Sequence, residues 1–159
     1  MAYIIRPPKP IEPAKNIFSV FLSSSVEINS VIPWQNLLVK ELINEDIVFF
    51  NPFRNAWDLA WEEVEGYEEK YKQQICWELK ALEQAALIVM YFGADVKAPV
   101  SLLEFGLQAR TGKLLVCCAK DFWRKKFIDI VCQQYGIPQA ENLEEVVSKI
   151  KEAAQKAKK

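Results

Sequence analysis

Four short apolar runs alternate along the chain with longer segments of helical spacing, and this alternation constrains the fold more than any other feature. The runs cover residues 17–22 (IFSVFL), 47–50 (IVFF), 86–92 (ALIVMYF) and 114–118 (LLVCC). Each run is apolar at consecutive positions, which is typical of strands buried on both faces of a parallel sheet. Strands that alternate with helices predict a single α/β domain, with a parallel sheet and helices on both of its faces.

The segments between and after these runs predict five helices. The first contains Trp34, Leu37, Leu38 and Leu42 on its inward face, and the next three cover about 68–84, 100–111 and 122–135. In the second helix we expect Ile75, Leu79 and Leu82 to face inward. Gly112 is expected just beyond the end of the third helix. Asn142 and Glu145 have the spacing of a capping box for the last helix, and the charged residues after Lys151 are expected to fray.

The length and the distribution of prolines divide the chain into three parts. Its 159 residues suit one domain of ordinary size. Residues 1–15 carry four prolines, which exclude a helix or a central strand, so we expect an extended arm. Residues 16–140 form the predicted α/β domain, and residues 141–159 form a C-terminal helix with a charged tail.

Charge, hydropathy and cysteine usage predict a cytoplasmic protein. The net charge of −1 favours neither nucleic acid nor an anionic membrane as a partner. No apolar run approaches the roughly 20 residues that span a bilayer, and Met1 to Pro13 lacks the apolar core of a secretory signal. The four cysteines include no CxxC pair, which is typical of small buried thiols in a reducing compartment.

The absence of histidine is the most useful negative in the composition. It excludes Ser-His-Asp and Cys-His catalysis and most metal sites. The chain also lacks the GxGxxG and GxxxxGK[ST] motifs, so dinucleotide and triphosphate binding are not expected. If the protein is an enzyme, carboxylates must act as its acid, base or nucleophile.

Three loops that follow predicted strands should converge at the carboxyl edge of the sheet, at 23–29, 51–67 and 93–104. Glu104 follows the third strand, early in a helix, where the helix dipole is expected to lower its pKa and keep it ionised as a nucleophile. Glu78 lies on the preceding helix and can project toward the same edge. Each carboxylate also has a plain interpretation, for Glu104 a partner of the helix dipole and for Glu78 a solvated helix residue.

The 51–67 loop is rich in aromatic and charged residues. Asp58 is adjacent to Trp57 and near Arg54, with which it can simply form a salt bridge. Phe53, Trp57 and Trp61 can stack on a planar base, although such residues more often anchor a loop to the core. Arg54 and Lys125 could hold a phosphate, but nothing in the sequence fixes their direction.

Six segments in order resemble the nucleoside 2-deoxyribosyltransferase-like family: IFSVFLSSSVE, NPFR..WD, Q..WELKALEQA, APVSLLEFG, GKLLVCC and FWRKK..DIVCQQYGI. The resemblance runs from about Ile17 to Ile137. It implies a flavodoxin-like fold, no metal or organic cofactor, and a homo-oligomer. It also implies a nucleoside and a free nucleobase as substrates.

The resemblance assigns roles to individual residues. Glu104 matches the family's nucleophile, and Glu78 matches its acidic residue on the preceding helix. Asp58 matches the aspartate of the family's NP-R-D loop, which holds the sugar and base. Either Glu78 or Asp58 would then give the departing base its proton. A double displacement would then move a 2-deoxyribosyl group from one base to another base, or to water, through a deoxyribosyl-Glu104 intermediate. Substrate contacts are expected from loop and strand-end residues: Ser23, Ser25, Asn51, Arg54, Trp57 and Phe127.

Three positions depart from the family pattern. Ser24 stands in place of a glycine, Ala86 in place of an aspartate, and Phe127 in place of an asparagine that reaches a neighbouring subunit's active site in relatives. These departures leave two alternatives to catalysis open. One is a degenerate relative that binds a nucleoside or nucleotide without turnover. The other is an oligomeric interaction protein, with the aromatic 51–67 loop and the basic run 124–126 as its interface.

Overall fold

The structure, a computed structural model, describes residues 1–12, 16–23, 33–54 and 66–159. These ranges contain six strands and five helices. In chain order the elements are β1 (Tyr3–Ile5), β2 (Phe18–Ser23), α1 (Trp34–Glu41), β3 (Ile47–Phe50), α2 (Tyr67–Gln84), β4 (Leu87–Phe92), α3 (Pro99–Gln108), β5 (Leu114–Cys118), α4 (Lys125–Tyr135), β6 (Gln139–Ala140) and α5 (Leu143–Ala157).

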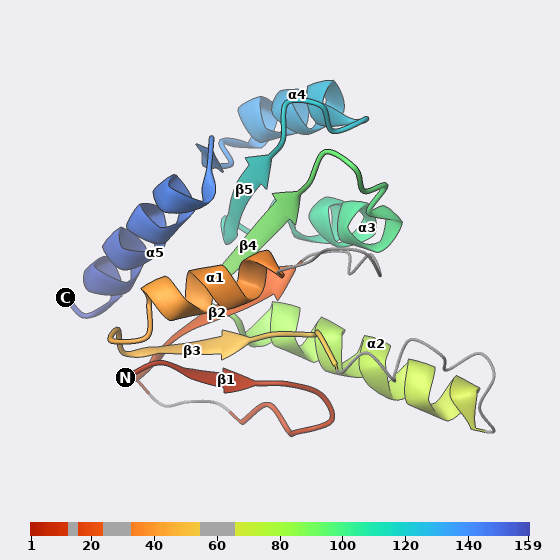
Figure 1. The fold of residues 1–159 in the computed structure, drawn as a ribbon, viewed down its shortest axis with the longest axis vertical. Coiled ribbons are helices and arrows are strands. Elements are labelled where there is room, and N and C mark those ends of the chain that lie inside the picture. The colour runs from red at the N-terminus through yellow and green to blue at the C-terminus, as the bar shows by residue number, and fades with distance from the viewer. Residues whose placement is uncertain (13–15, 24–32, 55–65) are drawn as a thin grey trace.

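All six strands pair in parallel in one sheet, in the order β1-β3-β2-β4-β5-β6 (Figure 1). Apart from the edge strand β1, this is the flavodoxin-like order, in which the direction of winding reverses between β2 and β4. The prediction of a flavodoxin-like α/β fold is therefore confirmed. Ligands of such folds bind at the carboxyl ends of the strands next to this reversal.

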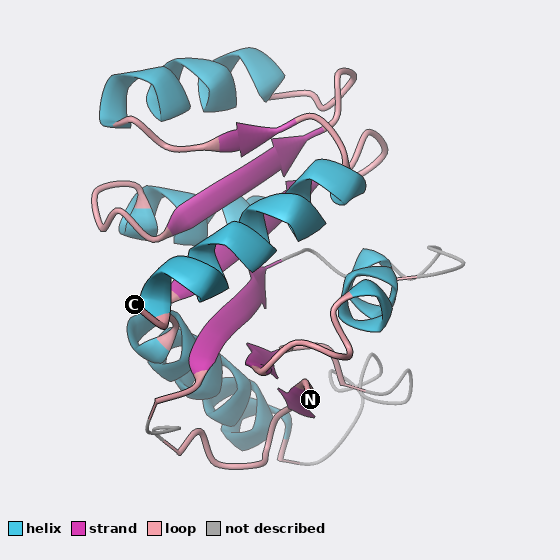
Figure 2. Ribbon diagram, turned by 90° about the vertical axis from the view of Figure 1, so that its left-hand side faces the viewer, coloured by secondary structure: helices cyan, strands magenta, loops and turns pink. Residues whose placement is uncertain are grey.

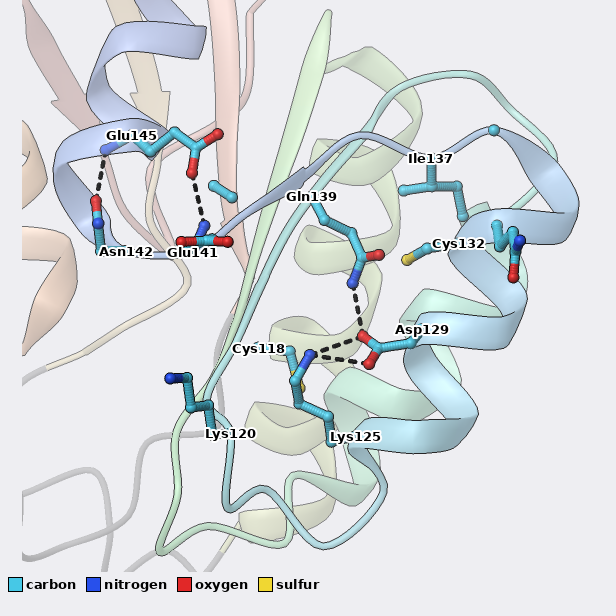
Figure 3. Close-up of a pocket in the computed structure, with 13 residues that line it drawn as sticks. Cys118, Lys120, Lys125, Asp129, Cys132, Ile137, Gln139, Glu141, Asn142 and Glu145 are labelled. Atoms are coloured by element: carbon cyan, nitrogen blue, oxygen red, sulfur yellow. Dashed lines mark hydrogen bonds and ion pairs between the residues drawn. The ribbon is translucent and has the colours of Figure 1, made fainter.

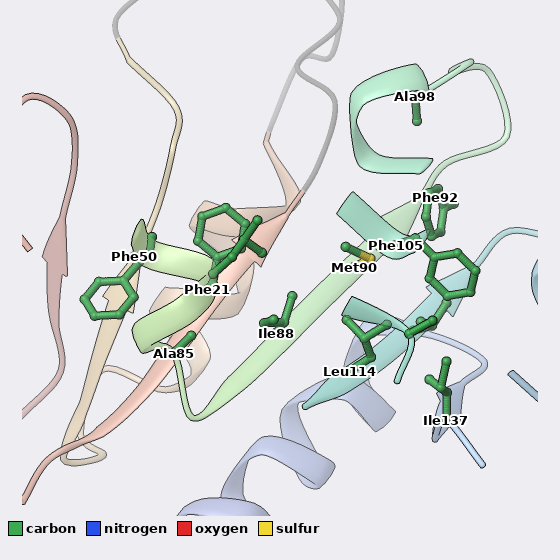
Figure 4. Packing of buried hydrophobic residues seen from close by; sticks show 14 of the residues in the cluster. Phe21, Phe50, Ala85, Ile88, Met90, Phe92, Ala98, Phe105, Leu114 and Ile137 are labelled. Atoms are coloured by element: carbon green, nitrogen blue, oxygen red, sulfur yellow. The ribbon is translucent and has the colours of Figure 1, made fainter. Parts of the chain in front are cut away.

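Helices cover both faces of the sheet. On one face α2, α3 and α4 pack over a core that includes Phe21, Ile88, Met90 and Phe105 (Figure 4). Helices α1 and α5 lie on the other face (Figure 2). They pack over a second core, which alternate strand residues such as Val20 and Val89 supply. Burial on both faces explains why the central strands are apolar at consecutive positions.

The N-terminal segment is attached to the domain through β1. Tyr3 to Ile5 pair with Val48 to Phe50 of β3, at the edge of the sheet where a proline-rich segment is tolerated. Ile11 is buried in the core, and the indole of Trp77 donates a hydrogen bond to the carbonyl of Lys9 at 2.8 Å.

The inward face predicted for α2 is partly wrong. Leu82 is fully buried, but Ile75 and Leu79 are 38% and 43% exposed, and Trp77 and Ala81 pack on the sheet instead. The helix carries apolar residues on two sides, so spacing alone does not select the packed side. Leu37 of α1, also predicted to face inward, is likewise exposed.

Two helix ends differ from the predictions. Helix α3 ends at Gln108, and Gly112 lies beyond it in the turn to β5, where its φ of +74° suits glycine. Helix α5 begins as predicted, since the Asn142 side chain accepts from the Glu145 amide. It does not fray after Lys151 but continues to Ala157, because Ala154 is buried against the second core.

Among the described helices, none combines the length and apolar character that crossing a bilayer requires.

Candidate functional site

The carboxyl ends of β2, β3 and β4 bring together several of the predicted site residues. Ser23 is the last residue of β2, Asn51 follows β3, and Glu104 lies on α3, which follows β4. Glu78 lies on α2, the helix that connects β3 to β4. Glu78 and Glu104 are close enough for their carboxyl groups to share a hydrogen bond. The group sits where the direction of winding reverses.

Glu104 is only 7% exposed, although a glutamate side chain that is free in water is charged at neutral pH. The hydroxyl of Ser23 donates a hydrogen bond to its Oε2 atom at 2.5 Å. Burial raises the pKa of Glu104 to about 7, the bond from Ser23 opposes this shift, and the neighbouring Glu78 adds to it. The predicted lowering of this pKa is wrong. Glu104 is the sixth residue of α3, beyond the first turn where the helix dipole acts.

Glu78 forms the other half of this carboxyl pair. Burial raises its pKa, while hydrogen bonds with Gln74 and Glu104 and the charge of Arg54 lower it. Two adjacent carboxyl groups, one buried and one half-buried, resist double ionisation, so the pair retains a proton at higher pH than isolated carboxyl groups do. A pair of this kind offers a carboxylate and a proton donor side by side.

Gln74 links this pair to the loop after β3. Its amide nitrogen Nε2 donates to Glu78 Oε1 at 2.5 Å and to the Pro52 carbonyl at 3.0 Å. Its amide oxygen Oε1 accepts from Arg54 Nε at 2.7 Å. Sequence reasoning missed Gln74. The available signal was its spacing of four residues from Glu78, which places both side chains on one side of the helix.

Asn51 and Arg54 act within the loop itself. The side chain of Asn51 is buried, and its Oδ1 atom accepts from the amide of Phe53 at 3.0 Å, which shapes the turn after β3. Arg54 contacts Gln74 and also donates from Nη2 to Gln73 Oε1 at 3.0 Å. The guanidinium thus faces α2 and the carboxyl pair.

The remaining predicted site residues either lie outside the described residues or are found elsewhere in the fold. Ser25, Trp57 and Asp58 lie outside the described residues, as do Ser24 and Trp61. Phe127 lies on α4 with its side chain 62% exposed. Ala86 precedes β4 at the amino end of the strand, where its amide donates to Ser19. Its replacement of an aspartate is therefore not a change at the carboxyl edge.

A polar cavity of about 1030 Å³ lies beyond β5, between α4, β6 and the start of α5 (Figure 3). Two of its charged groups, Lys125 and Asp129, bind each other. Lys125 Nζ contacts both carboxylate oxygens of Asp129 at 2.8 and 3.0 Å, and Gln139 donates to the same carboxylate at 2.8 Å. Lys125 is thus paired with Asp129 rather than directed at the carboxyl pair.

No three side chains of the metal-ligating types come together in residues 1–12, 16–23, 33–54 and 66–159. The carboxyl pair has only two such groups.

The chain is similar to known proteins in both sequence and structure. A family model described as "Nucleoside 2-deoxyribosyltransferase like" matches residues 17–122, which is more than half of the chain. The solved structure of the CMP N-glycosidase BcmB from Clostridium botulinum is similar, with a TM-score of 0.48 and 16% sequence identity over 84% of this chain and 98% of that one. No curated protein matches the sequence significantly.

Proposed function

Because the chain belongs to the nucleoside 2-deoxyribosyltransferase-like family, we propose that it breaks the N-glycosidic bond of 2-deoxynucleosides and passes the deoxyribosyl group to another base or to water. The observation that carries the proposal is the pair of buried Glu104 and half-buried Glu78 at the carboxyl edge of the sheet. Such a pair supplies the nucleophile and the proton that this reaction needs.

In the first step a carboxylate oxygen of Glu104 forms a bond to the anomeric carbon of the sugar. The bond from that carbon to the base nitrogen breaks, its electron pair stays on the nitrogen, and Glu78 gives the base a proton. Asp58 is the alternative donor from the sequence. The transition state resembles an oxocarbenium ion, which a sugar without a 2-hydroxyl reaches more easily because an electron-withdrawing group is missing.

In the second step the acceptor, a base nitrogen or a water oxygen, attacks the same carbon and releases Glu104. The acceptor loses a proton to Glu78, which returns the pair to its starting state. Two displacements retain the configuration at the anomeric carbon. The reactive form of the pair holds one proton, on Glu78. The hydrogen bond from Ser23 favours this form because it lowers the pKa of Glu104. The hydrogen bond between the two carboxyl groups raises the pKa of Glu104 and lowers that of Glu78, so the proton passes from Glu104 to Glu78 before the attack.

The decisive experiment is incubation of the protein with deoxyinosine or thymidine and free adenine, followed by chromatography. We expect new deoxyadenosine, or free base alone if water is the acceptor. Glu104→Ala should abolish either product, while Glu152→Ala, an exposed carboxylate on α5, should leave it unchanged. No product from any of several donor and acceptor pairs would favour a binding protein without turnover.

We also propose that the protein is a cytoplasmic homo-oligomer. Exposed apolar residues recur at helical spacing on two helices of the same sheet face, Tyr71, Ile75 and Leu79 on α2 and Val100, Leu103 and Leu107 on α3. Apolar stripes of this kind on a folded chain favour burial against a second copy. All four cysteines are free, which supports a reducing compartment.

A further inference from the structure

We propose that Gln74 is a positioning residue for the carboxyl pair and that its amide keeps one oxygen of Glu78 free of protons. The inference rests on the proposed function in that it concerns the proton that the departing base receives. The hydrogen bonds of Gln74 carry it, and none of the roles assigned above involves this residue.

The orientation of the Gln74 amide is determined by its neighbours. Arg54 Nε carries a hydrogen and can only donate, so the atom 2.7 Å from it must be the amide oxygen. The Pro52 carbonyl can only accept, so the atom 3.0 Å from it must be the amide nitrogen. Both neighbours agree, and a flipped amide would lose both bonds.

This orientation restricts the protonation of Glu78. Gln74 Nε2 donates its second hydrogen to Glu78 Oε1, with 2.5 Å between the nitrogen and the oxygen, so this oxygen must accept. A proton on the pair then resides on the other oxygen of Glu78 or on Glu104. Gln74 thereby excludes the proton from Glu78 Oε1 and leaves it to the other oxygen of Glu78 or to Glu104.

Among the described residues, other groups near the pair also shift the pKa values of its carboxyl groups. Arg54 faces Glu78 from the loop after β3 and favours its ionised form. Glu104 faces it from α3, and Ser23 at the end of β2 donates to Glu104. A donor to a carboxylate stabilises the ionised form, so Gln74 holds the titration of the pair at lower pH than burial alone would set.

The neighbouring Gln73 provides a matched control. It lies on the same helix, accepts from Arg54 Nη2 at 3.0 Å, and is exposed. No contact between Gln73 and Glu78 is present in the described part of the chain. Gln73→Met therefore removes a contact to Arg54 and leaves the donor to Glu78 in place.

The experiment compares the pH dependence of kcat/KM in the wild-type protein, Gln74→Met and Gln73→Met. Methionine keeps the length and helix propensity of glutamine but lacks the donor. We expect Gln74→Met to move the whole profile to higher pH, because Glu78 without this donor keeps its proton to higher pH. Gln73→Met should leave the position of the profile unchanged.

A second variant keeps the packing and reverses the character of the group that faces Glu78. Gln74→Glu keeps the shape and the acceptor for Arg54 but sets a carboxylate against Glu78 Oε1 in place of the donor, so it should move the profile further to higher pH than Gln74→Met. The inference is overturned if both Gln74 variants fold and keep the wild-type profile with only a uniform loss of rate. It is equally overturned if Gln73→Met moves the profile as far as Gln74→Met.

A readout without substrate distinguishes this inference from the proposed function. In protein labelled with ¹³C at the glutamate carboxyl carbon, the Glu78 resonance is the one missing from Glu78→Gln. Its titration should move to higher pH in Gln74→Met. A shift in a protein that exchanges no bases would reject the proposed function alone, whereas an active enzyme without the shift would reject the role of Gln74.

Discussion

Ser23 and Glu104 are joined by a buried hydrogen bond of 2.5 Å, although they are 81 positions apart in the sequence. Ser23 pairs with Met90 in the parallel register of β2 and β4, and Glu104 lies on the helix that leaves β4. A slip of this register by one residue would turn Ser23 to the other face of the sheet. The position of the proposed nucleophile is therefore tied to the pairing of the two central strands.

Ser23→Ala removes the hydrogen bond to Glu104 Oε2 and leaves a buried carboxyl without this donor. Because the bond lowers the pKa of Glu104 against the effect of burial, its loss should raise that pKa and move the pH profile of base exchange to higher pH. We expect a loss of about tenfold in kcat at neutral pH. Ser148→Ala, on the exposed side of α5, is the control. An unchanged profile in a folded Ser23→Ala protein would contradict the role of this bond.

Glu104→Gln should stabilise the protein at alkaline pH while it abolishes catalysis. The folded chain raises the pKa of Glu104 from 4.5 to about 7, so between these values the folded state binds more protons than the unfolded state. The free energy of unfolding then falls as pH rises through this window, and the loss is complete above it. Glu104→Gln should therefore raise the free energy of unfolding by on the order of 2–3 kcal/mol at pH 8 and leave it unchanged at pH 4.

Urea unfolding at both pH values measures this difference, with Glu152→Gln as an exposed control. Equal stability of Glu104→Gln and the wild-type protein at pH 8 would show that burial of this carboxyl has no energetic cost.

Glu78→Gln should slow the reaction most for substrates whose base must be protonated as it leaves. A glutamine cannot give a proton to the departing base, which costs roughly 10²–10⁴ in rate when the base leaves as a neutral molecule. A synthetic deoxynucleoside whose base is stable as an anion needs no proton, so its rate should change little. Steady-state rates with both substrate types test this. Equal losses for the two would assign Glu78 a purely structural role.

Leu103→Glu should shift the oligomeric state. Leu103 is 64% exposed in the apolar stripe on α3, and a charge there opposes burial against a second copy. Light scattering after size exclusion should show an oligomer for the wild-type protein and a smaller species for the variant. Ile43→Glu, at an exposed apolar position after α1, should keep the wild-type size. A monomeric wild-type protein at micromolar concentration would refute the proposed assembly.

The central fold could be predicted because its strands are buried on both faces. The runs around Phe21, Phe49, Val89 and Val116 contain no alternation that another fold would explain as well. Strands β1 and β6 were missed because they have three and two residues, too few to show a pattern. Their place in the sheet depends on partners that lie far away in the sequence.

The candidate site could be predicted only as a set of residue types. Glu104 and Glu78 were found because they are carboxylates among apolar neighbours, and the resemblance gave them roles. Their raised pKa values follow from burial and mutual proximity, which spacing along the chain does not reveal. Ser23 was expected to contact substrate, yet its hydroxyl binds Glu104, and no local pattern distinguishes the two uses.

The edge strand β1 has a consequence for solubility. Its three residues cover β3, whose four residues Ile47 to Phe50 are all buried. A protein that lacks residues 1–11 would expose the edge of this apolar strand with unpaired backbone donors and acceptors, which is a template for pairing with other chains. We therefore expect the proline-rich segment to protect the protein from aggregation, and its removal should make a stable preparation precipitate.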